Sequence, residues 1–470
     1  MPDAKQKVVI NIAGGWATDF GPAFTGAPQG NALTIPFLPR ADNVFYELDG
    51  GFHKVGGTAK FSAAQITESA AAVTIGGLYD YWTQGTSGVE GQSVVLYAGT
   101  KYLSMDPTTG VTTVRKTGLE SGKRPCFEVF KDQIILTTTS TVDAPQTWDQ
   151  SAGSTSALGG SPPKFSVLAK HKNRLFAAGV ATNGSRLYYC ATLDATTWSG
   201  LDAGSIDIDP DDGDRITGLA SHKNELLVFK GPNHLSIHRI TGSAPTGTDA
   251  FARVPYVSGL GSLNHQGIFR VNDDLVFSSP RGLHSLAATA AYGNYIEAFL
   301  SRPILSYYQD SLSHANGGLN MNWGVNYQSR GLAIWTVPSS GTTLDTYLVY
   351  DYRFQPGRWS RWTGYSNANC LAVVQDTNRR HRLYSGATDG WIRVLDQTSR
   401  SIDGTGAYAA NVTFPFLNFG TSSVLKTAED LFVSLVPKGS YDAGVAYTRD
   451  SSAEQTVSPA VSQAGSDPLG

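Results

Sequence analysis

Residues 207–242, DIDPDDGDRITGLASHKNELLVFKGPNHLSIHRITG, decide the fold of this chain. Three β-prone apolar runs, at 216–220, 226–229 and 235–240, are separated by two short polar turns, and a fourth run follows at 251–257. Runs of this length between turn residues are typical of antiparallel strands joined by hairpins. A four-stranded meander is the unit that a β-propeller repeats around an axis. The stretch therefore predicts one propeller blade.

A second copy of the pattern lies about fifty residues earlier. LAKHKNRL at 168–175 matches LASHKNEL at 219–226, and a period of about 50 residues is in the range of propeller blades. The His-Lys-Asn triplets at 171–173 and 222–224 could be taken for a binding motif. Because each triplet lies where a hairpin turn is expected, we interpret both as solvated turns.

Comparable strand patterns continue on both sides of this repeat. They predict an all-β protein, a β-propeller of six or seven blades. The expected blades are 71–115, 126–148, 165–190, 207–257, 267–286, 321–362 and, as a partial or closing blade, 370–395.

One segment, near 293–316, has a helical pattern instead. Apolar residues recur there at helical spacing, and a Ser-x-Pro sequence marks a start with a cap and a first-turn proline. The residues concerned are Ser301, Pro303, Ile304, Leu305, Tyr308 and Leu312. We expect a short packing helix inserted between blades, with a helix that docks a partner as the alternative.

The ends of the chain differ from its middle. Residues 1–40 carry repeated Gly and Pro, which break helices and strands, and predict an extended arm. Within this arm, 8–12 is a strand candidate, either closing the chain's own propeller or adding to a neighbour's sheet edge. The propeller is expected to span 41–398, with Asp-Gly-Gly at 49–51 as a hairpin turn.

Residues 399–470 predict a small C-terminal β-domain. Its strand candidates are 412–419, 430–436 and 444–448, whereas the polar, Gly- and Pro-containing tail 451–470 is not expected to add strands. Three strands leave exposed edges. We therefore expect either that this chain stops short of the domain's end or that a neighbouring subunit completes it.

Composition narrows the function classes. The formal net charge is −3 at pH 7, whereas general affinity for nucleic acid requires an excess of clustered Lys and Arg. Three widely spaced cysteines (Cys126, Cys190 and Cys370) fit buried thiols made in a reducing cytoplasm better than a disulfide framework. No apolar run reaches the length of a membrane span, and no signal-peptide core is visible near the start. We expect a soluble protein.

Catalytic motifs are not found. The chain has no GxSxG elbow, no HExxH pair and no P-loop with the required spacing. We expect a protein that is not an enzyme and assign no catalytic residue and no cofactor.

The one charge cluster is a run of five aspartates. An EF-hand Ca²⁺ loop needs Gly at its sixth position and Glu at its twelfth, but counting from Asp207 these positions hold Asp212 and Gly218. We interpret the cluster as a solvated surface loop, with a structural Ca²⁺ site as the alternative, and assign no metal ligand. The five are Asp207, Asp209, Asp211, Asp212 and Asp214.

Aromatic residues suggest a second class of function. Trp323, Trp335, Trp359 and Trp362 could serve as platforms for carbohydrate, but they alternate with apolar residues in expected strands, so core or inter-blade packing is favoured. Asp389-Gly390-Trp391 is similar to the Asp-box of sialidase propellers, although the residues around it do not fit that box.

Several short motifs follow one another along the chain. ADNV at 41–44 leads through GGFHK at 50–54 to Gly-Thr at 57–58. The later motifs are RLYY at 186–189, Trp198, DGDRITGL at 212–219, LLVFK at 226–230, ITG at 240–242, VNDDLVFSSPRGLHSL at 271–286, and VYD at 349–351 with Trp359 and Trp362. In order and spacing, these stretches resemble the β-propeller hub, or nozzle, proteins of short-tailed bacteriophages. The resemblance spans roughly residues 40–400, and the short C-terminal part departs from it.

This resemblance implies a structural protein of the virion tail, assembled in the host cytoplasm. Such hubs form a homo-hexameric ring below the portal and adaptor, extend the DNA channel, retain the genome and dock spikes or fibres. Double-stranded DNA would pass through the lumen without sequence-specific contacts, and no stable membrane insertion is expected. The alternative is a carbohydrate-binding or carbohydrate-cleaving propeller that acts as a receptor-binding tail component.

Overall fold

The computed structural model describes residues 8–20, 23–24, 29, 32–84, 90–287, 299–314, 322–365, 367–417, 441–447, 455–456 and 461–463. The chain divides into two compact units, Met1–Gly420 and Thr421–Gly470. No helix in the described part is long and apolar enough to cross a membrane.

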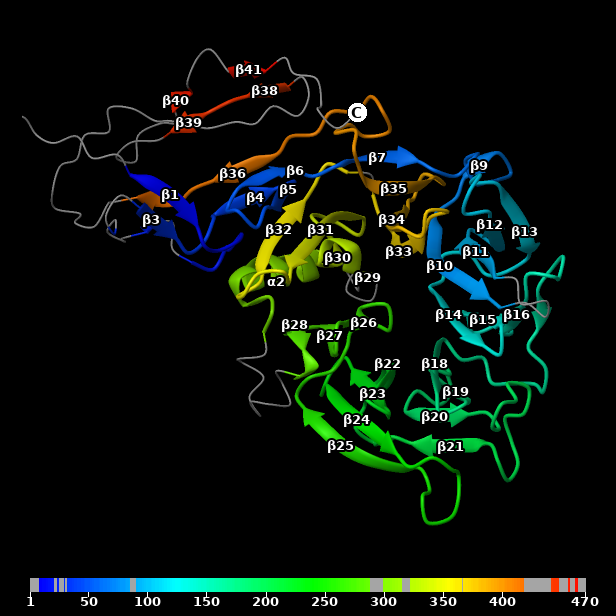
Figure 1. Cartoon of the computed structure of the whole chain (residues 1–470). Helices are drawn as coiled ribbons and strands as arrows, with labels where there is room; N and C mark the ends of the chain where they lie inside the picture. The colour runs from blue at the N-terminus through cyan, green and yellow to red at the C-terminus, as the bar shows by residue number, and fades with distance from the viewer. Residues whose placement is uncertain are drawn as a thin grey trace, which may run out of the picture. The chain divides into compact units, whose positions relative to one another are not determined.

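Seven sheets surround one axis in the first unit and form a seven-bladed β-propeller (Figure 1). In each blade the innermost strand comes first, and the next strands follow outward as an antiparallel meander. The prediction of an all-β propeller with six or seven blades is therefore confirmed, with seven. Blade one contains β10 (Ile75–Thr83), β11 (Gly91–Ala98), β12 (Lys101–Met105) and β13 (Thr112–Lys116); blade two contains β14 (Pro125–Phe130), β15 (Gln133–Thr138), β16 (Gln146–Trp148) and β17 (Ser156–Ala157); blade three contains β18 (Val167–His171), β19 (Arg174–Ala178), β20 (Arg186–Tyr189) and β21 (Gly204–Asp207); blade four contains β22 (Arg215–His222), β23 (Glu225–Gly231), β24 (Ser236–Thr241) and β25 (Ala252–Ser258).

The remaining blades depart from this regular plan. Blade five has three strands among the described residues, and blade seven takes its outermost strand from the start of the chain. Blade five contains β26 (Ile268–Val271), β27 (Asp274–Ser279) and β28 (Gly282–Ser285); blade six contains β29 (Gly324–Tyr327), β30 (Leu332–Pro338), β31 (Leu344–Asp351) and β32 (Arg358–Trp362), with η3 (Gln328–Arg330) between its first two strands; blade seven contains β33 (Cys370–Gln375), β34 (His381–Gly386), β35 (Ile392–Gln397) and β7 (Gly57–Lys60).

Blade seven closes the ring because β7 pairs antiparallel with β35, with Ala59 opposite Val394. Strand 8–12, which we expected either to close the propeller or to join a neighbour, does not close it. It forms β1 (Val9–Ile12), which pairs in parallel with β3 (Ala32–Ile35). Along the chain, β7 lies closer to blade one than β1 does, and blades one and seven are neighbours in the ring. A connection from β7 to blade one is therefore shorter than one from β1 would be.

An appendage lies on the outer side of blade six; we use this name for the described residues within 8–56 together with 399–417. Its strands β4 (Arg40–Asp42) and β36 (Asn411–Thr413) extend the sheet of blade six to six strands. The expected hairpin at 49–51 joins β5 (Val44–Tyr46) to β6 (Phe52–Lys54), and Gly50 supplies a φ of +95° in its turn. The other paired strands of the first unit outside the blades are β2 (Ala23–Phe24) with β37 (Phe416–Leu417), and β8 (Thr67–Glu68) with β9 (Ala71–Ala72).

The core lies between neighbouring blades. Every residue of β19 and of β30 is buried, because other blades cover both faces of these sheets. Such strands appear in the sequence as continuous apolar runs rather than as alternating ones. Ile135 of blade two packs in one cluster with Leu175 of blade three, whereas Phe176 of blade three joins Val228 of blade four.

Hydrogen bonds join blades that are not neighbours in the ring. Gln266 of blade five donates to the carbonyl of Pro125 in blade two at 2.8 Å, and these blades are not neighbours, so the contact crosses the axis. Arg124 donates to the Asn369 carbonyl at 2.9 Å and lies over the Trp323 ring. These contacts connect blades two, five and seven across the axis.

The expected helix within 293–316 is present as η1 (Arg302–Ile304) and α2 (Leu305–His314). Ile304 and Tyr308 are fully buried, and the Tyr308 hydroxyl donates to the Ser279 carbonyl at 2.9 Å. Ser301 occupies the cap position, but its hydroxyl accepts from the Leu283 N–H instead of capping the helix. The packing role is therefore confirmed, and the capping role of Ser301 is wrong because a blade strand takes its oxygen.

The second unit contains two short strand pairs among its described residues. The pairs are β38 (Tyr441–Ala443) with β41 (Val461–Gln463), and β39 (Ala446–Tyr447) with β40 (Gln455–Thr456). The polar tail 451–470 thus supplies two strands, contrary to our expectation, because backbone pairing of two or three residues needs no apolar face. The candidate 412–419 forms β36 and β37 in the first unit, and 430–436 lies outside the described residues.

Candidate functional site between blades three and four

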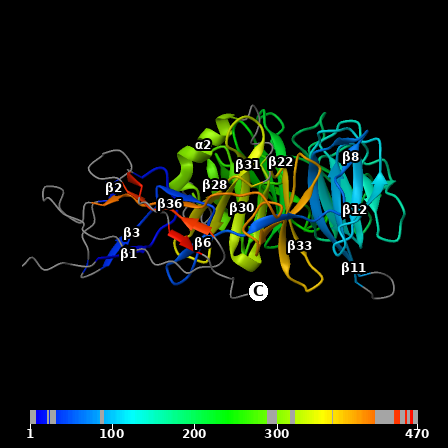
Figure 2. The ribbon, with the colours of Figure 1, turned by 90° about the horizontal axis from the view of Figure 1, so that it is seen from above.

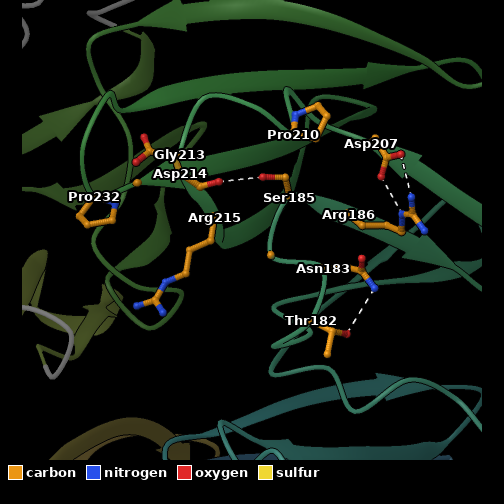
Figure 3. A pocket seen from close by; sticks show the side chains of 12 residues that line it. Thr182, Asn183, Ser185, Arg186, Asp207, Pro210, Gly213, Asp214, Arg215 and Pro232 are labelled. Carbon is orange, nitrogen blue, oxygen red and sulfur yellow. Dashed lines mark hydrogen bonds and ion pairs between the residues drawn. The ribbon is translucent and has the colours of Figure 1, made fainter.

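The aspartate-rich stretch lies beside a surface hollow of about 610 Å³ (Figure 3). One wall is the loop between β19 and β20, at 182–186. The other consists of the connection between blades three and four and the turn at Gly231–Pro232. The lining side chains are Thr182, Asn183, Ser185, Arg186, Asp207, Pro210, Asp214, Arg215 and Pro232, with glycines between them.

Asp214 is buried and holds the turn of blade four. Its carboxylate accepts from the backbone N–H groups of Asn233 at 2.7 Å and of His234 and Leu235 at 2.9 Å. Burial raises the pKa of this carboxyl, but the donated hydrogen bonds outweigh it, and the pKa lies below its usual range. The backbone of Asn233, His234 and Leu235, between β23 and β24, thus binds one ionised side chain.

Lys230 is fully buried and holds the other end of the stretch. Its ammonium donates to the carbonyls of Ile208 at 2.6 Å and Asp209 at 2.7 Å, and to both carboxylate oxygens of Asp212 at 2.7 Å. A buried cation is tolerated only when it is paired and hydrogen-bonded in this way. Sequence reasoning missed this residue, although a lysine at the end of the apolar run LLVF is a visible anomaly.

Two further aspartates are paired with cations at the surface. Arg186 donates two hydrogen bonds to Asp207, at 2.6 and 2.9 Å, and Arg253 pairs with Asp209. Asp211 is exposed. Four of the five carboxylates are therefore held by donors of their own chain, and the structure brings them together as a loop anchor.

These contacts bear on both interpretations of the cluster. The solvated-loop interpretation is wrong for Asp214, which is 5% exposed, because the turn of blade four covers it. Within the part of the chain that the structure describes, no group of three His, Cys, Asp or Glu side chains is arranged to hold a metal ion.

Arg215 is the exposed cation of the hollow. Its guanidinium has no hydrogen bond or ion pair with any described residue, and it points away from the Arg186–Asp207 pair in Figure 3. The two carboxylates that line the hollow are both engaged, Asp207 by Arg186 and Asp214 by backbone N–H groups. The hollow can therefore contact a polar partner, but neither carboxylate is free to act as a general base.

The two His-Lys-Asn triplets are turns only in part. Lys172-Asn173 and Lys223-Asn224 have positive φ at both positions, which is the type I′ geometry of two-residue hairpins. The histidines before them are buried, at 4% and 8% exposure for His171 and His222, so the solvated interpretation is wrong for them. His171 is within 2.9 Å of the Ser221 hydroxyl, and this contact joins blade three to blade four.

Lysines in these turns also reach the next blade. Lys172 donates to the Gly242 carbonyl at 2.8 Å, and Lys131 in the corresponding turn of blade two donates to the Leu193 carbonyl at 3.1 Å. In the first triplet, His171 and Lys172 therefore join blade three to blade four.

The tryptophans considered as carbohydrate platforms are buried. Trp335, Trp359 and Trp362 are at most 1% exposed, and Trp323 is 8% exposed. Trp335 and Trp359 pack against each other with ring centroids 6.0 Å apart. The packing interpretation of these residues is confirmed.

The three cysteines are buried and unpaired, as expected from their spacing. Burial raises the pKa of Cys126 and of Cys370 to about 12. Because the thiolate is the reactive form, these residues are inert packing groups at neutral pH.

Comparisons with known proteins give fold-level likeness. No protein-family model matches the chain, and no curated protein matches it. Among solved structures, BamB from Moraxella catarrhalis is 15% identical with a TM-score of 0.41, covering 75% of this chain and 95% of that one. A chain of the mitotic checkpoint complex is 9% identical with a TM-score of 0.44, covering 75% and 94%. The seven-blade assignment depends on the strand order itself.

Proposed function

We propose that this protein is a structural component of a bacteriophage tail, a hub or nozzle subunit that assembles as a hexameric ring. The observation that supports the proposal is the resemblance of an ordered set of motifs to that family. The motifs begin on β4 of the appendage and continue on the propeller, from β7 through β20, β22 and β23 to β31 and β32.

The roles of the polar side chains in this chain fit a structural subunit better than a reaction centre. The conspicuous carboxylates at 207–214 are used to anchor a loop, and the buried histidines and cysteines pack between blades. A hydrogen bond between Gln266 and the Pro125 carbonyl crosses the axis of the propeller. In the proposed ring, double-stranded DNA passes through the centre of six copies and not through the axis of one.

The partners follow from this role. The ring would lie below the portal and adaptor in the virion tail, retain the genome before ejection, and offer its outer loops to spikes or fibres. A lumen of low positive charge would let DNA slide, because each phosphate contact adds salt-dependent affinity.

The experiment is negative-stain imaging of the purified chain, alone and with its candidate adaptor protein. We expect six-fold rings with a central hole wide enough for duplex DNA. A chain that never associates with the adaptor and binds a glycan instead would overturn the proposal in favour of the carbohydrate-binding or carbohydrate-cleaving alternative. The four tryptophans that could have served as carbohydrate platforms for that alternative are buried.

A further inference from the structure

Three arginines lie where the outer strands of blade six meet the appendage, and two of them are paired with buried aspartates. Figures 1 and 2 both place the appendage strands β3 and β36 on the same side of the propeller as α2, away from blade one. Arg361 of β32 donates to Asp42 of β4 at 2.8 and 3.0 Å. Arg353 donates to Asp351, the last residue of β31, at 2.9 and 2.7 Å. A further arginine, the exposed Arg40, also pairs with Asp42. Both carboxylates of the junction are therefore already engaged.

Arg358, the first residue of β32, is the third arginine, and it is buried at 8% exposure. Its Nη2 donates to the Ile12 carbonyl of β1 at 3.1 Å, whereas its buried Nε and Nη1 have no hydrogen-bond partner in the described chain. Asp351 lies opposite Arg358 in the β31–β32 ladder, but its oxygens accept from Arg353. Among the described residues, no carboxylate forms an ion pair with Arg358.

Aromatic rings and the N-terminal arm enclose this guanidinium. Its Cζ lies 3.9 Å from the centroid of the Phe354 ring and 5.5 Å from that of Tyr46. On the arm, the Trp16 N–H donates to the Trp359 carbonyl at 2.8 Å. Gly15 approaches the same strand so closely that a Cβ there would lie 2.4 Å from the Trp359 nitrogen. The arm therefore packs on the backbone of β32 directly beside the guanidinium.

The buried charge of Arg358 requires a counterion. Burial lowers the pKa of this group, but a guanidinium stays protonated in a folded protein. A buried charge is costly unless it is paired, and buried donors without an acceptor are rare in native proteins. A water molecule would accept a hydrogen bond and leave the charge uncompensated, whereas an anion does both.

We propose that Arg358 binds a small monovalent inorganic anion, such as chloride, at the junction of blade six and the appendage. Its Nε–H and Nη1–H groups are the donors, and one negative charge balances the one arginine that lacks a carboxylate. A divalent oxyanion would leave excess negative charge beside Asp351. Because Nη2 of the same side chain binds the Ile12 carbonyl, the anion fixes the guanidinium and, through it, β1 of the arm. This site goes beyond the proposed tail function and does not depend on it.

An anion exchange at constant ionic strength tests the site in the full chain. Chloride replaces isethionate, a bulky sulfonate, up to about 0.3 M, so that the screening of surface charges stays the same. The wild type is compared with Arg358→Met. The control is Arg380→Met, which removes one positive charge from the exposed connection between β33 and β34. Thermal denaturation and hydrogen exchange of the β1 amides are the two readouts.

We expect chloride to raise the thermal midpoint of the wild type and of Arg380→Met by about 2–4 °C, because a ligand bound only by the folded chain stabilises it. Arg358→Met should lose this dependence. Chloride should slow exchange of the β1 amides in the wild type and not in Arg358→Met. A wild-type midpoint that is the same in both anions, or a chloride dependence that persists in Arg358→Met, would overturn the site.

Bromide crystallography covers the case in which Arg358→Met does not fold. In crystals of the wild type grown with bromide, anomalous scattering should place the ion within hydrogen-bond reach of Nε or Nη1 of Arg358. A water molecule there without anomalous signal, or bromide at exposed arginines alone (an adventitious ion only), would overturn the proposal. Either result leaves the proposed tail function standing, because ring assembly is measured separately.

Discussion

Blades four and seven each have four strands, but the chain builds them in different ways. Blade four is one continuous segment, and its entry loop is anchored by Lys230 to Asp212, eighteen residues away. Blade seven receives β7 from the start of the chain, and Thr58 contacts Asp403 across 345 residues. Blade four can therefore form from local contacts, whereas blade seven is complete only when both ends of the propeller have met.

The difference shows where the chain places its buried charges. In blade four a buried lysine fixes a loop, and in blade seven a buried arginine fixes the closure. Arg393 donates to Asp389 at 2.6 and 2.9 Å and to Asp403 at 3.0 and 3.1 Å. Each cation thus marks the position where its blade is joined to a segment outside its own meander.

Lys230→Met should have the largest effect on this comparison. It removes the fully buried donor of Asp212 and of two carbonyls, and we expect a loss of about 3 kcal/mol in the free energy of unfolding. Urea denaturation measures it. Lys223→Met, in an exposed turn of the same blade, should change stability by less than about 0.5 kcal/mol. Equal effects of the two variants would show that the Lys230 contacts do not anchor the loop.

Arg393→Met should lower the free energy of unfolding by about 2 kcal/mol, somewhat less than Lys230→Met does. Asp389 is 46% exposed, so water can solvate part of the charge that the arginine leaves. Hydrogen exchange should show faster opening of β7 than of blade four. The control is Arg379→Met, which removes a pair with Glu90 that is exposed on both sides and contributes little. A loss larger than that of Lys230→Met would mean that ring closure, and not the loop anchor, dominates stability.

Asp214→Asn should lower stability at pH 7 by about 1–2 kcal/mol, because the amide keeps only one acceptor oxygen and turns an NH2 group toward at least one of the three backbone N–H donors. The pKa of this carboxyl is lower in the folded chain than in the unfolded one. Its contribution is therefore present above the unfolded value of about 3.9 and is lost as the pH falls through the folded value. The difference between the wild type and the variant should shrink below about pH 4. A difference that is constant from pH 7 to pH 3 would contradict this account.

Thr58→Val should lower the free energy of unfolding by about 1 kcal/mol, the smallest decrease among these variants. The threonine is fully buried, and its hydroxyl donates to Asp403 at 3.2 Å, while the backbone pairing of β7 remains. The thermal midpoint should fall slightly without a change in cooperativity. A loss comparable to that of Arg393→Met would indicate that the hydroxyl, not the ion pairs, holds the closing strand.

Sequence reasoning predicted six or seven blades and placed most of their strands, because the strands of a blade follow one another in the chain. Runs such as LLVF at 226–229, between turns with positive φ, carry their own strand and hairpin signals. The same reasoning placed the packing helix and predicted burial of the tryptophans and cysteines. It failed for the closing strand, because β7 has only four residues and its partner lies more than three hundred residues away.

The candidate site, too, could be predicted from the sequence only in part. The five aspartates were visible as a cluster, but their partners were not, because Arg186, Arg253 and the turn at 233–235 are brought to them only by the packing of neighbouring strands. A carboxylate is charged in any unfolded chain, so sequence alone favours a solvated loop. Burial of Asp214 and of Lys230 depends on which donors the fold supplies.

By itself the sequence determined the class of this protein, since periodic β-prone runs with turn residues specify successive hairpins whatever surrounds them. Tertiary structure decided which strand closes the ring and which charges are buried. Those outcomes depend on contacts between residues far apart in the chain, and no local propensity encodes them.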